Sequence, residues 1–222
     1  MDHVREHGSI LAAPEKRLLT GIARRLPAAV TSDELTLLAF ASMGLAGAGY
    51  VLAWHDRRFL YMSIGALALN WFGDSLDGTL ARVRRLERPR YGFYVDHVVD
   101  IVGITLLMGG LAISGFMSPV VALAVLVAYL LVSGEVFLAT SVHHVFRLSF
   151  AGWGPTELRI LLAVGTAALW TDPHVTIAGI GAVRLFDLGG VIAVGGLGFA
   201  LLVAVCRTTM SLSRLEPVRR TP

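Results

Sequence analysis

Apolar residues along the chain gather into six long stretches that short polar segments separate. Each stretch comes near the roughly 20 residues that an α-helix needs to cross the hydrocarbon core of a bilayer. The fifth stretch is the shortest, and its apolar character extends toward residue 180. We therefore predict six membrane-spanning helices, at residues 35–54, 59–82, 92–115, 118–142, 156–172 and 187–207.

The segment before the first stretch follows a helical pattern. In residues 14–26, Leu18, Ile22 and Leu26 recur every four positions, and Pro14 suits the first turn of a helix. Such an amphipathic helix can lie in the membrane interface, with its basic residues against anionic headgroups. A solvated helix packed on the protein's own surface fits the pattern equally well. The basic residues of the segment are Lys16, Arg17, Arg24 and Arg25.

Composition supports a membrane-embedded protein. Apolar residues make up 55% of the chain and charged residues only 16%, whereas a soluble domain carries about 25% charged residues. The single cysteine, Cys206, excludes an internal disulfide framework and a cysteine-based metal site. We expect one all-α domain over residues 1–222, with a tail and interfacial helix at 1–34, a six-helix bundle at 35–207 and a tail at 208–222.

The distribution of positive charge predicts an orientation. All but three of the 19 Lys and Arg residues fall on one side of the predicted spans, the exceptions being Arg57, Arg58 and Arg184. The positive-inside rule then places both termini in the cytoplasm, together with the connections at 82–90 and 143–157. We expect a multi-pass protein of a prokaryotic cell (inner) membrane.

Four aspartates lie in or beside the second and third stretches. A charge at membrane depth costs roughly 2.5–3.5 kcal/mol on insertion scales, so such residues usually serve a function. Asp74 and Asp77 are three residues apart, and Asp96 and Asp100 are four apart, so each pair shares one helix face. The connection between the two helices is short. We expect them to be antiparallel neighbours whose four carboxylates converge at the cytoplasmic end of the bundle.

Converging carboxylates repel one another, and divalent cations relieve that repulsion. Hard oxygen ligands, with neither cysteine nor a close histidine pair, suit Mg²⁺ or Mn²⁺, and two ions would neutralise four carboxylates. Three small residues, Gly78, Ala81 and Gly92, lie on the carboxylate faces, where they permit either close helix packing or close approach of a ligand. Arg82 follows one turn after Gly78 and can meet a phosphate.

Eight positions of this segment share a recognisable spacing: Asp74, Asp77, Gly78, Ala81, Arg82, Gly92, Asp96 and Asp100. Their residue types and spacing resemble the signature of the CDP-alcohol phosphatidyltransferase family. The resemblance extends more weakly to six spans behind an interfacial helix. It also includes an Asn-x-x-Thr motif at the start of the first span, where this chain has Asp33 and Thr36.

The resemblance implies a reaction of phospholipid biosynthesis. A CDP-linked alcohol donates its phosphoryl-alcohol portion to an acceptor alcohol, and CMP is released. The resemblance also implies a homodimer in the membrane. The implied metal ligands are Asp74, Asp77, Asp96 and Asp100, the last of which would also act as general base. The implied nucleotide and pyrophosphate pocket is lined by Gly78, Ala81, Arg82, Gly92 and Thr36.

The two alcohols stay open, because either CDP-diacylglycerol with a polar acceptor or a CDP-aminoalcohol with a lipid acceptor fits. Asp96-His97 resembles the Asp-His of choline/ethanolamine phosphotransferases, and residues 154–157 resemble a Gly-Pro-Thr-Glu segment of some aminoalcohol phosphotransferases. Glu157 can bind a cationic headgroup, but it also suits the first turn of a helix through the helix dipole. Arg147 and Arg159 are candidates for binding an anionic group of the acceptor or of a lipid.

Two other functions are less well supported. A transporter could use intramembrane carboxylates to carry a cation, but transporters often show inverted repeats and broken helices, and the sequence shows neither. A non-catalytic lipid-binding relative is disfavoured because all four aspartates are present. Membrane lipids and the two alcohols are the expected partners, and we expect no nucleic acid.

Overall fold

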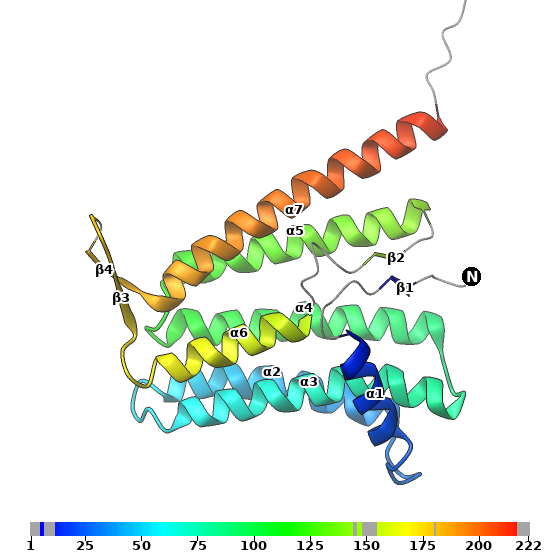
Figure 1. Ribbon diagram of the computed structural model, residues 1–222, viewed down its shortest axis with the longest axis horizontal. Coiled ribbons are helices and arrows are strands. Elements are labelled where there is room, and N and C mark those ends of the chain that lie inside the picture. Colours follow the sequence, from blue (N-terminus) through cyan, green and yellow to red (C-terminus); the bar gives the residue numbers. More distant parts are fainter. Residues whose placement is uncertain (1–4, 7–11, 144–145, 148–154, 180, 217–222) are drawn as a thin grey trace, which may run out of the picture.

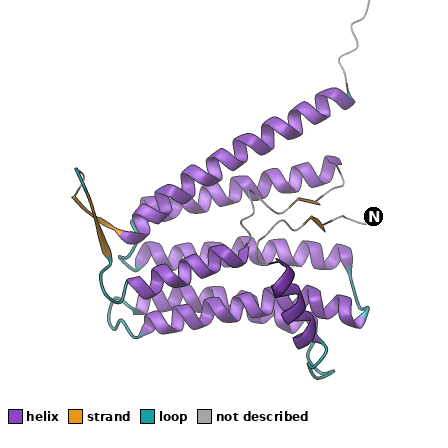
Figure 2. Ribbon diagram, viewed as in Figure 1, coloured by secondary structure: helices purple, strands orange, loops and turns teal. Residues whose placement is uncertain are grey.

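The structure, a computed structural model, describes residues 5–6, 12–143, 146–147, 155–179 and 181–216. Within these residues the chain is mostly helical (Figure 1 and Figure 2). The helices are α1 (Ala12–Ala23), α2 (Ser32–Leu52), α3 (Phe59–Arg84), α4 (Pro89–Ile113), α5 (Pro119–His143), α6 (Pro155–Ala168) and α7 (Leu185–Leu215). The strands are β1 (Arg5–Glu6), β2 (Phe146–Arg147), β3 (His174–Ile177) and β4 (Gly181–Arg184).

Each of the six apolar stretches forms a helix, α2 to α7, as the hydrophobic pattern predicts. Among the described residues, four helices are long and apolar enough to cross a membrane: α2, α4, α5 and α7. These four helices indicate a protein that crosses the membrane several times. Helix α3 is long enough but carries Asn70, Asp74 and Asp77, and α6 has only 14 residues, so six spans remain a prediction.

The segment after α6 differs from the prediction of an all-α fold. Helix α6 ends at Ala168 rather than reaching residue 172 or beyond, and β3 pairs antiparallel with β4 in a short hairpin. Pro173 cannot continue a helix, and Asp172 Oδ1 accepts a hydrogen bond from the backbone N of His174 at 2.8 Å. In addition, β1, which lies in the predicted N-terminal tail, pairs parallel with β2 of the connection between α5 and α6.

Helix α2 packs against both α3 and α4, whereas α3 and α4 do not pack closely on each other. Glycines make these contacts close. A Cβ on Gly73 of α3 would lie 2.6 Å from the carbonyl oxygen of Leu35 on α2, and a Cβ on Gly110 of α4 would clash with the backbone of Gly47 on α2. The two carboxylate-bearing helices are antiparallel, but α2 is the neighbour they share. The prediction that they are direct neighbours is wrong for this reason.

Helix α1 packs on the protein itself. Its Leu19 and Ala23 are buried in a small apolar cluster with Leu35 of α2 and with Leu76 and Leu80 of α3. The basic residues of α1 are exposed, which leaves membrane contact at that face as a prediction. A second, larger apolar cluster joins α2, α3, α4, α5 and α7 nearer the hairpin, where the hydroxyls of Tyr50 and Thr166 hydrogen-bond at 2.5 Å.

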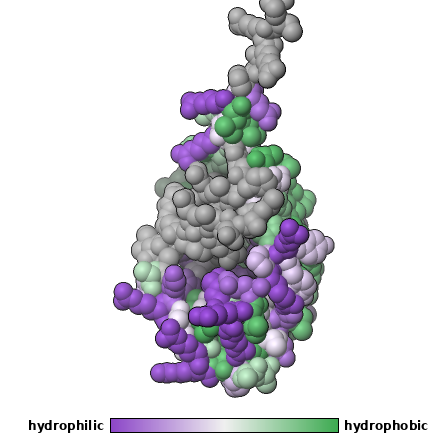
Figure 3. Space-filling model, turned by 90° about the vertical axis from the view of Figure 1, so that its right-hand side faces the viewer, coloured by the Kyte–Doolittle hydropathy of each residue, from purple (hydrophilic) through white to green (hydrophobic). Residues whose placement is uncertain are grey.

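The two ends of the bundle carry different connections between the helices. The α3–α4 connection and the C-terminal ends of α5 and α7 lie at one end, and the hairpin with the α2–α3 and α4–α5 connections lies at the other (Figure 1). Seen from the first end, hydrophilic side chains gather in the lower part of the molecule (Figure 3). This is the end that the charge distribution assigns to the cytoplasm.

Candidate functional site

The aspartates of α3 and α4 sit beside a connection that local interactions hold in place. Helix α3 ends in a left-handed residue, Arg85 (φ 56°), and α4 begins with Pro89 in its first turn. Arg84 Nη2 donates to the carbonyl oxygens of Pro27 and Leu26, at 2.8 and 3.2 Å. These contacts tie the C-terminal end of α3 to the segment between α1 and α2.

The N-terminus of helix α2 lies beside the α3–α4 connection. It has a capping box, in which the Thr31 side chain accepts from the Glu34 backbone N–H and the Glu34 side chain accepts from that of Thr31. Asp33, which stands where the family motif has asparagine, is exposed and pairs with Arg88, whose guanidinium lies 4.1 Å from the ring of Tyr91. Asp33 is thus engaged with the α3–α4 connection.

Asp77 is held by α2. The hydroxyl of Thr36 donates to Asp77 Oδ2 at 2.6 Å, and the hydroxyl of Ser32 donates to the Asp77 carbonyl oxygen at 2.8 Å. The backbone N–H of Gly78 donates to Asp77 Oδ1. Thr36, a candidate from the sequence, therefore lies at a carboxylate and orients it.

Asp74 forms an ion pair with Arg159. Arg159 Nη2 lies 2.6 Å from Asp74 Oδ2, and the side chains are only 18% and 24% exposed, respectively. Water screens such a pair less than a surface pair. Helix α6 thus brings one candidate acceptor-binding residue into direct contact with one of the four aspartates, a contact that the sequence does not indicate.

Asp100 lies at the centre of the group. Asp74, Asp96, Asp77 and Arg159 all act on it electrostatically, so the four aspartates occupy one region between α3, α4 and α6. Asp100 keeps part of its residue surface accessible, although other groups crowd its carboxylate. A ligand can therefore reach this carboxylate while its neighbours surround it.

The donor chemistry of the group suits a hard divalent cation, because all four side chains offer carboxylate oxygens. In the part of the chain that the structure describes, no three His, Cys, Asp or Glu side chains lie close enough to hold a metal ion as they stand. Asp74 Oδ2 is already taken by Arg159. The residue types therefore suit a metal ion, but Asp74 would have to release Arg159 before it could bind one through Oδ2.

Two glycines of the predicted pocket are not required by helix packing. A Cβ on Gly92 would meet nothing within 4 Å among the described residues, and a Cβ on Gly78 would meet only the flexible end of Arg82, at 3.4 Å. Arg82 itself is exposed, and its Nη2 donates to the hydroxyl of Thr79 at 3.1 Å. Ala81 is half-buried. The open space favours ligand approach over packing as the reason for the glycines.

The residues suggested for the acceptor are scattered. His97 lies between α4 and α5, with its Nδ1 at 2.6 Å from the Phe93 carbonyl oxygen and its ring 4.8 Å from that of Phe137. Glu157 is half-buried in the first turn of α6. Arg147 belongs to β2, but its side chain lies outside the described residues, as do His144 and Gly154.

Two residues near the site gave no clear signal in the sequence. Tyr129 of α5 is half-buried and lies within electrostatic range of Asp100, Asp74 and Arg159, although it sits in an otherwise apolar stretch. Glu15 of α1 accepts hydrogen bonds from α3 and α6. The only hint for Glu15 is its place as an acid beside basic residues.

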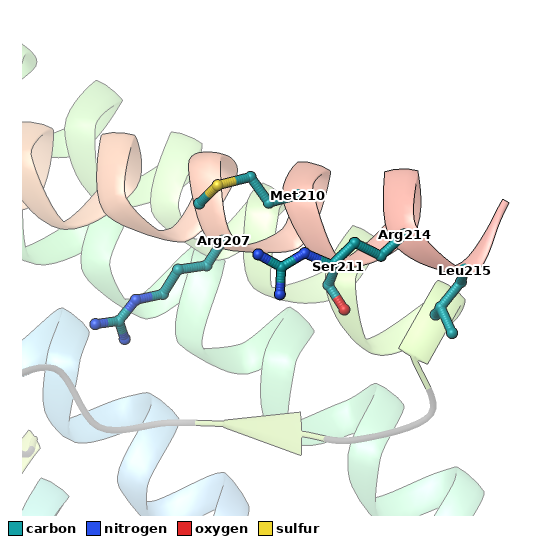
Figure 4. A pocket seen from close by; sticks show the side chains of 5 residues that line it. All are labelled: Arg207, Met210, Ser211, Arg214 and Leu215. Carbon is teal, nitrogen blue, oxygen red and sulfur yellow. The ribbon is translucent and has the colours of Figure 1, made fainter. Parts of the chain in front are cut away.

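Two cavities lie elsewhere. One, of about 400 Å³, is at the hairpin end of the bundle and is lined in part by Trp54, Arg57 and His174. Another, of about 430 Å³, lies along α7, where the side chains of Arg207 and Ser211 hang from the same side of the helix (Figure 4). Neither cavity is lined by any of the four aspartates.

Comparison with known proteins identifies a family for this chain. The family model described as CDP-alcohol phosphatidyltransferase matches residues 26–212, which include α2 to α6 and all four aspartates. No curated protein matches the chain.

Proposed function

The chain belongs to the CDP-alcohol phosphatidyltransferase family, and from this premise we propose that it moves a substituted phosphate group from a CDP-linked alcohol to an acceptor alcohol, releasing CMP. The family acts by transfer from CDP-alcohols in phospholipid synthesis. The observation that carries the proposal is the gathering of Asp74, Asp77 and Asp96 around Asp100, whose residue surface stays partly accessible.

The proposed cofactor is a pair of divalent ions, Mg²⁺ or Mn²⁺. Asp74, Asp77 and Asp96 would hold them, with Asp100 contributing to the second. When bound, such ions stabilise the charge that develops on phosphoryl oxygens. The hydrogen bond from Thr36 to Asp77 Oδ2 supports this role, because a carboxylate that accepts such a bond has a fixed orientation.

Asp100 is the proposed general base. Its carboxylate takes the proton of the acceptor hydroxyl while that oxygen bonds to the phosphorus that carries the donor alcohol. The bond from this phosphorus to the oxygen of CMP breaks in the same displacement. The open space beside Gly78 and Gly92 accommodates the nucleotide, with Ala81 alongside, and the exposed Arg82 reaches the pyrophosphate.

We propose that Arg159, Glu157 and Arg147 contribute to choosing the acceptor. Arg159 is the best supported of the three, since it already contacts Asp74 at the edge of the aspartate group. A guanidinium in this position can bind a phosphate or another anionic group of an acceptor. The identity of the two alcohols depends on these residues rather than on the aspartates.

The proposed setting is a homodimer in a prokaryotic inner membrane, with both termini and the active site cytoplasmic. Cytoplasmic placement agrees with the source of CDP-alcohols and with the gathering of hydrophilic side chains at one end of the bundle. Of the three glycines in the second half of α4, Gly103 and Gly110 face α2. A Cβ on Gly109 would meet nothing within 4 Å among the described residues, so this position can approach a second copy.

A CMP-release assay on purified protein tests the proposal, with a panel of CDP-alcohol donors and acceptors. We expect one donor–acceptor pair to release CMP, a chelator to abolish release, and Asp100→Asn to reduce kcat by about 10²–10⁴-fold, the usual contribution of a general base. Asp56→Asn, in the connection at the opposite end of the bundle, is the matched control and should leave the rate unchanged.

Two results would contradict the proposal. Normal turnover of Asp100→Asn would remove Asp100 as the base. Metal-dependent cation flux into liposomes without any nucleotide would instead favour the transporter function.

A further inference from the structure

Glu15 lies outside the aspartate group, yet it joins the two helices that carry Asp74 and Arg159. Its Oε1 accepts hydrogen bonds from Trp71 Nε1 at 2.7 Å and from Ser75 Oγ at 3.2 Å, both on α3. The same oxygen accepts from Thr156 Oγ1 of α6 at 2.9 Å. One carboxylate of α1 therefore links three helices.

The donors stand next to the residues of the ion pair. Ser75 follows Asp74 directly on α3, and Thr156 precedes Arg159 by three residues on α6, which is about one helical turn. The Asp74–Arg159 pair and the Glu15 hydrogen bonds thus form two parallel links between α3 and α6. Any change in the spacing of these helices acts on both links.

A purely local role does not account for Glu15. An acid in the first turn of a helix is favoured by the helix dipole, but the dipole requires no partner on α3 or α6. Leu19 and Ala23 already hold α1 on the bundle through apolar burial. The basic neighbours Lys16 and Arg17 are exposed, whereas Glu15 is half-buried and contacts α3 and α6. Hydrogen bonds to a charged acceptor are also stronger than neutral ones.

We propose that Glu15 is a positioning residue for the transfer reaction, which sets the spacing of α3 and α6 and so orients Asp74 and Arg159. This inference rests on the proposed function. Glu15 does not touch the substrates, and it acts only through the two helices that it links. Its effect should therefore appear in kcat and in the KM of the acceptor, with less change in the KM of the CDP-linked donor.

The first experiment compares Glu15→Ala with Glu15→Gln by CMP release. Loss of a residue that orients catalytic ligands typically costs about 10–100-fold, and we expect a loss of kcat in this range for Glu15→Ala. Glu15→Gln keeps a carbonyl oxygen as acceptor and should recover most of the rate. The matched control is Glu135→Ala, which removes a carboxylate that accepts from Thr208 Oγ1 at 2.9 Å between α5 and α7. The control should keep the wild-type rate.

A double-mutant comparison separates positioning from general destabilisation. If Glu15 acts through the ion pair, Glu15→Ala should cost much less in an Arg159→Gln background than in the wild type, because the pair it orients is already lost. If the fold-losses in rate of the two single variants multiply in the double variant, the two residues act independently and the proposal is overturned. Should Glu15→Ala fail to fold, Thr156→Val and Ser75→Ala each remove one link and test the same expectation.

A distance measurement needs no activity. Spin labels on exposed positions of α3 and α6, Val83 and Ile160, can be placed in a Cys206→Ser background. We expect Glu15→Ala to broaden the distance distribution between these labels, and an unchanged distribution would overturn the proposal. If the distribution broadens in Glu15→Ala but the wild-type protein releases no CMP from any donor, the role of Glu15 in spacing the two helices is supported. The proposed function alone is then refuted.

Discussion

The Thr36 hydroxyl is the contact that most directly orients a carboxylate of the site. It donates to Asp77 Oδ2 at 2.6 Å from the first turns of α2. Because the acceptor is charged, we expect Thr36→Val to remove about 1.5–3 kcal/mol of interaction and to lower kcat/KM by roughly 10-fold or more. Steady-state CMP release measures this.

Thr105→Val is the control for Thr36→Val, since the Thr105 hydroxyl donates only to the Ile101 carbonyl oxygen of its own helix, at 2.8 Å. It should leave kcat/KM unchanged. An equal loss in both variants would mean that the effect of Thr36 is not specific to Asp77.

Arg159 competes with any cation for Asp74 Oδ2, because one oxygen cannot serve both fully. We expect Arg159→Gln to bind Mn²⁺ more tightly, as followed by paramagnetic resonance of free Mn²⁺. We also expect it to unfold more easily in chelator, by about 1–2 kcal/mol. The latter figure lies below the 3–5 kcal/mol of a fully buried pair because the two side chains are 18% and 24% exposed.

Arg88→Gln removes the same charge from the same end of the molecule and serves as its control. Its pair with Asp33 is about half exposed on both sides, at 52% and 51%, and should contribute little. Weaker Mn²⁺ binding by Arg159→Gln would show that Arg159 orders Asp74 for the metal instead of competing with it.

At the scale of elements, α2 determines how α3 and α4 present their aspartates. It packs on both, and the close approach of Gly47 and Gly110 sets the distance between α2 and α4. The aspartate faces can then surround a ligand because α3 and α4 are not pressed together. Small residues on α2 and its partners are therefore part of the site's architecture, although they lie away from the chemistry.

Two adjacent glycines of α4 test this. A Cβ on Gly110 would clash with the Gly47 backbone, so Gly110→Ala should destabilise the protein by about 1–3 kcal/mol through overpacking. A Cβ on Gly109 would meet nothing within 4 Å among the described residues, so Gly109→Ala should be neutral or stabilise the helix by up to about 1 kcal/mol. Thermal unfolding in detergent measures both.

Equal behaviour of the two alanine variants would contradict the packing of α2 on α4. A loss of stability in Gly109→Ala alone would instead place a second copy of the chain, or another partner, against that position.

At the scale of the whole molecule, charge and hydropathy divide the bundle along its length. Four helices meet the requirements of a membrane span, while α3, with its aspartates, and the short α6 do not. These two helices supply Asp74 and Arg159. The helices that do not meet the requirements of a membrane span therefore contribute residues to the candidate site. The cost of charged groups at membrane depth favours a functional role for those that α3 and α6 carry.

The hydrophobic pattern was enough to predict the helices α2 to α7, because burial in lipid or protein and local backbone hydrogen bonding act over a few turns of one segment. The helical spacing of the four aspartates likewise predicted that they gather in one region, and their chemistry stays a prediction. The hairpin at 174–184 was missed, since a short β-pair next to Pro173 leaves only a weak local signal.

Long-range contacts were beyond the reach of any local pattern. The Asp74–Arg159 pair joins residues 85 positions apart, and the Glu15–Thr156 hydrogen bond joins residues 141 positions apart. Such contacts depend on how whole helices pack, here through glycines that bring α2 against both α3 and α4. Residue types and spacing thus determined which helices form and where the acidic groups lie along them. Only the tertiary structure decided which of those groups meet, because packing between distant segments sets their distances.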